Sequence, residues 1–538
     1  MFKNRKKFKA EFVEGSDAPF STSTPYSIAA GDTFEGTLST RSDSDAIAFE
    51  VEAGVTYTIS LDSFGADGVP DTYLYIFDSE GQAIAMDDDS GEGLNSLVTF
   101  TATSSGKFYI GATGVGRDTT GDYKITLTSN AGPVDPDDPV DPDEPVDPNA
   151  FTNDQIAAQL TDGFWESNHD SRRSFDVSPG EAITVDIGDL NADGRELAIK
   201  ALQAWTMTTG INFEFVTSNA QITFDDNESG AYSTSSTSGG TIRSSFVNVS
   251  TDWVASYGTD LDGYAFQTYM HEIGHAMGLG HAGNYNGSAD YGVDNHYSND
   301  SWQASVMSYF DQRDNTSVDA SFAYVVSPMI ADILAMQELY GTTADLRTES
   351  TVYGENSTAG GYYDEIADLR PVAFTVIDNG GIDSINFSSV TADQKISLIA
   401  ETYSDVDGLT GNMAIMRGTV IENAYSGSGD DQLIGNSADN ALYANAGDDV
   451  LEGGQGDDTL SGGTGSDTFV FNINCDADTI IDFSDGLDFM MFESGASNFA
   501  DLTVQDTGAD TVVSYDGGSI TLTGIESSLI SADDFMFA

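Results

Sequence analysis

The segment HEIGHAMGLGH carries the residue types and the spacing of a metal site. His271 and His275 are four residues apart, so on a helix their imidazoles lie on one side and can share an ion. Glu272 can reach a water at that ion without being a ligand itself. Gly278 permits the positive φ that ends a helix sharply, after which His281 can supply a third nitrogen. Three neutral ligands leave a fourth position open, which is the arrangement of a catalytic rather than a structural zinc.

Histidine is scarce in this chain, which makes the spacing informative. The sequence has 5 histidines, and three of them stand in this motif. His169 and His296 have no comparable neighbours and are expected to be solvated loop residues. The single cysteine, Cys475, excludes an internal disulfide and is expected to be a buried, inert thiol. The motif therefore predicts one catalytic Zn²⁺ as a cofactor.

A second short motif, SVMSYF, lies downstream and contains Met307 and Tyr309. A zinc motif of this length followed by a methionine-containing turn is typical of metzincins. With these residues the sequence resembles the serralysin-type metzincin endopeptidases. The resemblance implies that Met307 forms a hydrophobic base under the metal and that Tyr309 swings away from the zinc to stabilise the transition state. One departure is Ala282, which follows the third histidine where serralysins usually carry proline.

The resemblance and the zinc motif together predict an endopeptidase that hydrolyses peptide bonds in proteins with broad specificity. Zinc would lower the pKa of water toward about 7 and polarise the scissile carbonyl. Glu272 would take the proton of that water and deliver it to the leaving amine, while Tyr309 would hydrogen-bond the oxyanion. An extended substrate is expected to pair with an edge strand near TIRSSFVNVS, because backbone pairing is largely blind to side chains.

The elements that must position these residues follow from hydrophobic periodicity. Apolar residues at helical spacing predict helices over 196–210, 264–277 and 329–341. Strand-like segments lie between the first two, namely INFEFVTS, ITFDD and TIRSSFVNVS. Mixed helices and strands indicate an α+β domain over residues 150–345, which the resemblance identifies as a metzincin catalytic domain.

From Ser426 to Val470 the sequence repeats with a period of nine. The eighth position is apolar and the sixth is acidic or an amide: Leu433, Leu442, Leu451, Leu460 and Phe469 at the eighth, and Asp431, Asn440, Asp449, Asp458 and Asp467 at the sixth. This is the RTX pattern, in which backbone carbonyls and aspartates bind Ca²⁺ and the apolar position forms the core of a parallel β-roll. A flexible Gly/Asp linker is the alternative. The second frame, with Ala438 and Asn440, predicts a weak or missing calcium site.

The segments around the repeats also resemble serralysins. DNGGIDSINFS resembles the calcium-bearing lead into the roll, which implies calcium contacts from Asp378 and Asp383. The ending ADDFMFA resembles the C-terminal export signal of that family, with Ala538 as an additional residue. Residues 346–538 show no convincing helix, so we expect an RTX β-roll that holds several structural Ca²⁺ ions and folds only at extracellular calcium.

Short alternating strands over residues 25–130 predict an antiparallel β-sandwich. This region resembles a bacterial pre-peptidase C-terminal domain, on the segments DSDAIAFEVEAG and DYKITLTS. Residues 1–24 precede it, and residues 131–149, rich in Pro and Asp, predict an extended linker open to cleavage. The predicted fold class is therefore multidomain: an N-terminal antiparallel β-sandwich, an α+β metzincin catalytic domain and a C-terminal parallel β-roll.

The net charge of the chain limits the classes of partner that it can bind. Its 538 residues include 88 acidic and 19 basic side chains, a net charge of −69. Such a chain repels phosphate backbones and anionic lipid, which argues against nucleic-acid and membrane partners. The basic N-terminus is not followed by an apolar run, so we expect no Sec signal peptide and export by type I (ABC-type) machinery. A secreted, extracellular monomer that acts on protein or peptide substrates is expected. The alternative is a calcium-dependent surface-binding or adhesion RTX protein with a secondary peptidase domain.

Overall fold

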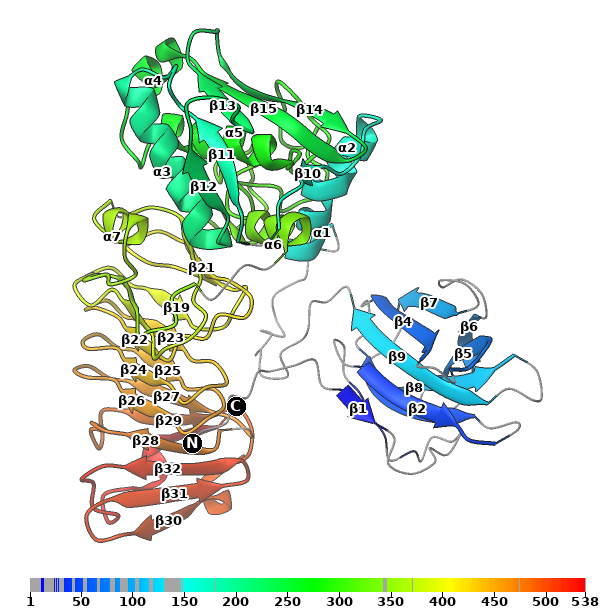
Figure 1. Ribbon diagram of the computed structural model, residues 1–538. Helices are drawn as coiled ribbons and strands as arrows, with labels where there is room; N and C mark the ends of the chain where they lie inside the picture. Colours follow the sequence, from blue (N-terminus) through cyan, green and yellow to red (C-terminus); the bar gives the residue numbers. More distant parts are fainter. Residues whose placement is uncertain are drawn as a thin grey trace. The chain divides into compact units, whose positions relative to one another are not determined.

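The computed structural model divides the chain into two compact units, Met1–Pro136 and Asp137–Ala538 (Figure 1). The structure describes residues 11–13, 24, 26, 28, 33–40, 44–51, 56–64, 68–77, 83–87, 95–101, 106–115, 120–129, 147, 149–178, 180–341, 346–369, 371–473 and 475–537. The predicted linker and the N-terminal segment lie almost entirely outside these residues. Among the described residues, no helix combines the length and the apolar character needed to cross a bilayer.

The first unit consists of two β-sheets that enclose an apolar core. The sheet orders are β1-β2-β9-β4-β7 and β3-β8-β5-β6, and all pairs are antiparallel except β1 with β2. The strands are β1 Glu11–Val13, β2 Thr33–Leu38, β3 Asp45–Val51, β4 Thr56–Ser63, β5 Thr72–Phe77, β6 Ala83–Asp87, β7 Ser96–Thr101, β8 Gly106–Gly114 and β9 Gly121–Ser129. Side chains alternate between the two faces of a strand, and Leu74, Ile76, Ile125 and Leu127 are fully buried on the inner faces. The strands predicted between residues 25 and 130 are therefore present.

The second unit begins with a sheet of order β10-β15-β13-β11-β12, with β14 added to the free side of β15. The strands are β10 Ser174–Phe175, β11 Ala182–Asp186, β12 Asn212–Phe215, β13 Ile222–Asp225, β14 Ala231–Ser238 and β15 Thr241–Val249. Only β14 runs antiparallel within this sheet. The strand predicted at TIRSSFVNVS is β15, but it lies inside the sheet, between β13 and β14. The edge strand that was expected near this segment is β14, which the hydroxyl-rich stretch before β15 forms.

Three helices appear where the periodicity predicted them. α5 covers Tyr264–Met277 with the predicted bounds, while α3 covers Ala192–Thr209 and α6 covers Ile330–Tyr340. α3 begins at Asn191, whose side-chain oxygen accepts the N–H of Gly194 at 2.8 Å. Helices that the sequence did not predict are α1 Asn153–Ala158, the π-helical turn Gln159–Gly163, α2 Phe164–Ser167 and α4 Thr251–Tyr257.

The C-terminal part of this unit is built mainly from short parallel strands in two stacks (Figure 1). One sheet has the order β16-β18-β22-β24-β26-β28-β32-β31-β30, the other β19-β23-β25-β27-β29-β33. The strands are β16 Val352–Gly354, β17 Phe374–Val376, β18 Ser384–Asn386, β19 Lys395–Ser397, β20 Tyr403–Ser404, β21 Met413–Ile415, β22 Asn423–Tyr425, β23 Gln432–Ile434, β24 Ala441–Tyr443, β25 Val450–Glu452, β26 Thr459–Ser461, β27 Thr468–Phe471, β28 Ala477–Ile480, β29 Phe489–Phe492, β30 Thr503–Asp506, β31 Thr511–Tyr515, β32 Gly518–Leu522 and β33 Phe535–Phe537. β17, β20 and β21 form a small separate sheet. The C-terminal part departs from the expected parallel roll at β30, β31 and β32, which pair antiparallel, as do β20 and β21.

The nine-residue period sends successive frames to alternate sheets. Leu433, Leu451 and Phe469 are register partners in one sheet, and Leu442 and Leu460 are partners in the other. All five are fully buried, so the apolar ladder forms a continuous interior rather than a flexible linker. One helix does occur after residue 345, α7 at Tyr362–Ile366, which corrects the expectation of none.

One hydrophobic core runs through the whole second unit, from Ile156 to Phe535. Side chains also join α1 to the loops of the C-terminal part: Arg417 pairs with Asp154 at 2.7 Å and with Glu401 at 2.5 Å. Helix α5, which carries two of the motif histidines, therefore shares one core with the stacked strands.

Candidate active site

Helix α5 places His271, Glu272 and His275 on one wall of a cleft, and the turn after the helix brings in the third histidine. Gly278 has φ 121°, and a Cβ there would overlap the main-chain oxygen of Arg173. A side chain at this position is therefore excluded both by the backbone conformation and by the neighbouring chain. Beyond the turn, the N–H of Gly280 donates to the main-chain oxygen of Leu160 at 2.7 Å, which directs the chain back toward the helix.

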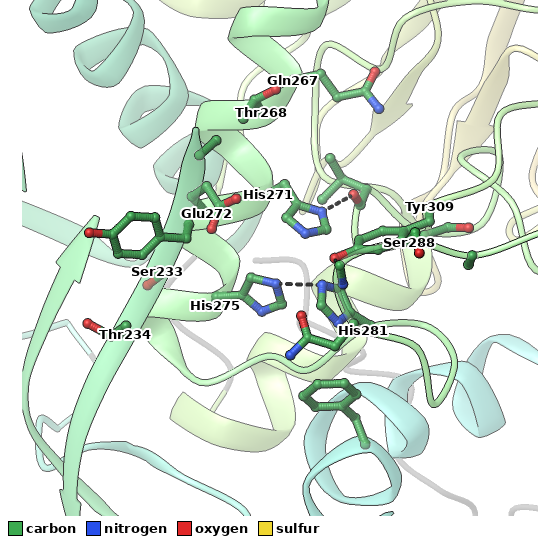
Figure 2. A pocket seen from close by; sticks show the side chains of 18 of the residues that line it. Ser233, Thr234, Gln267, Thr268, His271, Glu272, His275, His281, Ser288 and Tyr309 are labelled. Carbon is green, nitrogen blue, oxygen red and sulfur yellow. Dashed lines mark hydrogen bonds between the residues drawn. The ribbon is translucent and has the colours of Figure 1, made fainter. Parts of the chain in front are cut away.

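The three imidazoles of His271, His275 and His281 converge on one point (Figure 2). Each offers a nitrogen, and these atoms lie within 4.8 Å of one another. The Nε2 atoms of His275 and His281 are 2.9 Å apart. The Nδ1 of His271 lies 2.9 Å from the oxygen of Val306, and the Nδ1 of His275 lies 2.8 Å from the oxygen of Leu279. A nitrogen beside a carbonyl oxygen carries the proton, so the other nitrogen of each of these two rings presents a lone pair.

The electrostatics of the three rings favour the neutral, ligating form. Burial lowers the pKa of His271 to about 4, and burial together with the neighbouring imidazole of His271 lowers the pKa of His275 to about 3. Burial also holds the pKa of His281 well below its usual value. The Nε2 atoms of His275 and His281 lie close enough to share one ion, and at least one of them presents a lone pair, so this set of donors fits a metal ion such as zinc.

Glu272 lies beside His271 on the cleft wall (Figure 2). The side chain is 6% exposed, and its Oε2 has no hydrogen-bond partner among the described residues. Burial raises the pKa of this carboxyl to about 8. A buried carboxyl with a pKa near neutrality can take up and release a proton.

Met307 and Tyr309 reach the site from the turn that follows it in the sequence. Met307 is fully buried beneath α5, where its Sδ lies 2.7 Å from the position that a Cβ on Gly274 would occupy. The Tyr309 ring lies 4.5 Å from the ring of His281, centroid to centroid, and its hydroxyl accepts the N–H of Gly287 at 3.3 Å. Burial raises the pKa of Tyr309, so its hydroxyl keeps its proton and can donate it in a hydrogen bond.

The cleft around the histidines has a volume of about 790 Å³ and is bounded on one side by β14. Residues 231–235 of this strand line it, and β14 pairs with β15 and with no other described strand. The sequence does not predict this wall, since the segment AYSTSSTS has no apolar alternation that would indicate a strand.

The two remaining histidines and the single cysteine, for which no role was predicted, lie outside the site. His169 and His296 are exposed loop residues, as expected. Cys475 is buried, and burial raises its pKa to about 11, so it is an unreactive thiol at neutral pH.

Comparison with known proteins gives matches over most of the chain. Residues 342–536 match the family described as "Peptidase M10 serralysin C terminal", and residues 43–114 match "Bacterial pre-peptidase C-terminal domain". The chain is 37% identical over 406 residues to Metallopeptidase AprA of Pseudomonas marginalis, a match that covers 69% of this chain and 85% of that relative. The chain belongs to the serralysin family of metallopeptidases.

Two further relatives are serralysins by name. The chain is 39% identical over 292 residues to a serralysin of Photorhabdus laumondii and 36% identical over 313 residues to serralysin C of Dickeya chrysanthemi. These matches cover 52% and 53% of this chain, and 59% and 64% of the relatives, so each spans less than two thirds of the relative. Membership of this family confirms the predicted metallopeptidase class and does not favour the adhesion alternative.

Away from the histidines, the serralysin-family C-terminal part buries the six aspartates predicted to contact calcium. Asp378 and Asp383 lie together, and the N–H of Asp383 donates to Glu422 at 2.7 Å. Glu422 was missed because it lies far from these two aspartates in sequence and outside the nonapeptide frames. The Oδ2 of Asp383 has no hydrogen-bond partner among the described residues, and burial raises its pKa to about 6.

The repeat aspartates form two ladders, one on each side of the stacked strands. From the second member of each ladder onward, the carboxylate accepts the main-chain N–H of the ladder residue one turn earlier. In one ladder the main-chain N–H of Asp431 donates to Oδ1 of Asp449 at 2.7 Å, and the N–H of Asp449 donates to Oδ1 of Asp467 at 3.1 Å. In the other ladder the N–H of Asn440 donates to Oδ1 of Asp458 at 2.7 Å, and the N–H of Asp458 donates to Oδ1 of Asp478 at 3.1 Å. The second oxygens of Asp449, Asp458 and Asp467 are buried without a partner among the described residues. Asp478 continues a ladder beyond the five frames, where the period is interrupted, and the repeat pattern therefore could not reveal it.

Proposed function

We propose that this serralysin-family protein is a secreted, zinc-dependent endopeptidase with broad side-chain specificity, held together by calcium. His271, His275 and His281 would hold the zinc. The observation that supports this most directly is the 2.9 Å separation of two Nε2 atoms, at least one of which is unprotonated because its ring donates through Nδ1. The other cleft residues are then placed to act on a peptide bound beside the zinc.

When bound, zinc supplies a Lewis acid that polarises the scissile carbonyl and lowers the pKa of water toward about 7. Glu272 takes the proton of the attacking water and passes it to the leaving nitrogen, a task suited to a carboxyl whose pKa burial has raised to about 8. Tyr309 breaks its hydrogen bond with the N–H of Gly287, and its hydroxyl then donates a hydrogen bond to the oxyanion. Met307 packs under α5 and keeps the helix and the turn at a fixed separation.

An extended substrate would add to the sheet along β14, whose outer edge faces the cleft. Main-chain hydrogen bonds to a strand are available to any peptide sequence. Small hydroxyl side chains, such as Ser233, Thr234 and Ser235 on this edge, place few steric demands on a substrate. This arrangement supports broad specificity toward proteins and peptides.

Calcium would bind at Asp378 and Asp383 and along the two aspartate ladders, where partnerless carboxylate oxygens are buried. Burying several carboxylates without cations is unfavourable, since each desolvated charge raises the free energy of the folded state. The C-terminal part would therefore fold at extracellular calcium, after export of an unfolded monomer by type I machinery. We also propose that the domains follow the predicted bounds of 25–130, 150–345 and 346–538.

A metal and activity assay on matched variants tests this function. Glu272→Gln should keep one zinc per chain, measured by plasma mass spectrometry, and lose casein hydrolysis by a factor of about 10²–10⁴. His275→Ala should lose both zinc and activity, while His296→Ala, a change at an exposed histidine outside the cluster, should keep both. Full activity of Glu272→Gln, or full zinc content of His275→Ala, would overturn the proposal.

A further inference from the structure

Asp300 is a carboxylate buried between the third-histidine loop and the methionine turn. It is fully buried, and its Oδ1 accepts two hydrogen bonds, from the Ser308 hydroxyl at 2.7 Å and from the Tyr285 hydroxyl at 3.1 Å. Its Oδ2 has no hydrogen-bond partner among the described residues. Burial raises the pKa of Asp300 to about 6, so the group is still ionised at neutral pH. Burying such a carboxylate carries a free-energy cost that an apolar residue would not.

The two hydroxyls that hydrogen-bond to Asp300 also accept hydrogen bonds from main-chain N–H groups at Tyr309 and Phe310. An ionised carboxylate only accepts hydrogen bonds, so the hydroxyl protons of Tyr285 and Ser308 both point toward Asp300. Their lone pairs are then free to accept main-chain donors. The Tyr285 hydroxyl accepts the N–H of Tyr309 at 3.3 Å, and the Ser308 hydroxyl accepts the N–H of Phe310 at 3.1 Å.

The Tyr285 ring extends the same link to the histidines. It lies 4.8 Å from the Tyr309 ring and 5.7 Å from the His281 ring, centroid to centroid. Gly283 lies behind it, where a Cβ would approach the Tyr285 ring at 2.5 Å. Tyr285 therefore touches the third histidine with its ring and the backbone of Tyr309 with its hydroxyl, and Asp300 fixes the rotation of that hydroxyl.

We propose that Asp300 is a positioning residue that acts through Tyr285 and Ser308 to set the backbone from which Tyr309 reaches the transition state. The proposal rests on the role given to Tyr309 in the proposed function. A hydrogen bond made only in the transition state requires its donor to be placed to within a fraction of an ångström, and a misplacement of about 1 Å can lower the rate by about 100-fold. A side chain that must move between Gly287 and the substrate depends on a backbone that does not move.

Removing the Tyr285 hydroxyl tests the link while keeping the ring. Tyr285→Phe should lower kcat about 10-fold and leave KM within about twofold, because a transition-state contact is weakened and ground-state binding is not. Zinc content should stay at one per chain. Tyr291→Phe is the matched control, because the Tyr291 hydroxyl donates to the main-chain oxygen of Ser298 at 2.7 Å and its ring packs on Phe310, while none of its described contacts reaches Tyr309. This variant should keep kcat within about twofold.

The decisive readout is the double variant. In the Tyr309→Phe background, Tyr285→Phe should cause no further loss of kcat, since the donor that it positions is already gone. Equal losses in both backgrounds would overturn the positioning role and leave Tyr285 as a structural residue. If Tyr309→Phe itself retains full activity, the role of Tyr309 in the proposed function fails instead.

Asp300 is tested in the same way with two substitutions. Asp300→Asn keeps an acceptor at Oδ1 and should retain more kcat than Asp300→Ala. Neither substitution should lower kcat further in the Tyr309→Phe background. If Asp300→Ala does not fold, the Asp300→Asn and Tyr285→Phe measurements decide the question. Equal kcat values for wild type and Asp300→Asn, together with no effect of Tyr285→Phe, would contradict the proposal.

Discussion

At the scale of single residues, the site depends on carboxylates that never touch a substrate. Val306 supplies the oxygen that orients His271, and Val306 is itself held by Asp332 on α6. Asp332 is fully buried and accepts three hydrogen bonds, from the Ser305 hydroxyl at 2.6 Å, the Val306 N–H at 2.8 Å and the Met329 N–H at 2.9 Å. The ring of His271, a proposed zinc ligand, is thus oriented by a carbonyl of Val306, and the N–H of Val306 is held by a buried acid on α6.

We predict that Asp332→Ala destabilises the protein by about 3–5 kcal/mol, because three buried donors lose their acceptor at once. Urea unfolding of the second unit, followed by tryptophan fluorescence, measures this loss. Asp252→Ala, an exposed position in the first turn of α4, is the control and should change the free energy of unfolding by less than about 0.5 kcal/mol. Similar midpoints for Asp332→Ala and Asp252→Ala would contradict the role given to Asp332.

At the scale of elements, what could be predicted depended on the length and amphipathic pattern of each segment. α5 was predicted with its observed bounds because fourteen residues carry a clear apolar face. α4 and α7 have 7 and 5 residues, too few for a helical period to be recognised. β14 was missed because its residues are hydroxyl-bearing or small and it faces the cleft, so no alternation of apolar residues marks it. The histidine cluster was readable from spacing alone, whereas Asp300, Asp332 and Glu422 join their sites only through tertiary contacts.

The turn after α5 gives a prediction at this scale. Gly278→Ala should reduce zinc content and lower the free energy of unfolding, since the added Cβ overlaps the main-chain oxygen of Arg173 and displaces the segment that carries His281. Gly258→Ala is the matched control, because Gly258 also follows a helix with positive φ, 85°, but has open space around it. The control should lose about 1–3 kcal/mol from backbone strain, because φ 85° and ψ 178° suit glycine almost alone, and it should keep its zinc. Zinc content per chain and urea midpoints distinguish the two, and equal zinc content in both variants would show that the close approach at Gly278 is not required.

At the scale of the whole molecule, the two units have separate cores, and every residue of the candidate active site lies in the second. The core of the second unit is shared between the helices around the histidine cluster and the stacked strands. A change that unfolds the aspartate ladders should therefore also unfold the active site, whereas the sandwich should remain folded.

Protonation of the ladder aspartates should partly replace calcium in stabilising the second unit. Burial raises the pKa of Asp449 and of Asp478 to about 7, and that of Asp458 to about 8, against the usual value of 3.8. A carboxyl with a raised folded pKa adds stability that is complete below its unfolded pKa and is lost as pH rises through the folded pKa.

In metal-free protein, the calorimetric transition of the second unit should therefore move to higher temperature as pH falls from about 8 to about 6.5. His271, His275 and His281 act in the opposite direction, because burial lowers their pKa values, but within this window they offset only part of the change. Calcium should raise the same transition and flatten its dependence on pH, while magnesium at equal concentration serves as the control and should do so less, because it prefers to keep its own water ligands. The transition of the sandwich should not respond to calcium. A metal-free second unit that loses stability between these two pH values, or one that calcium leaves unchanged, would contradict the calcium role proposed for the ladders.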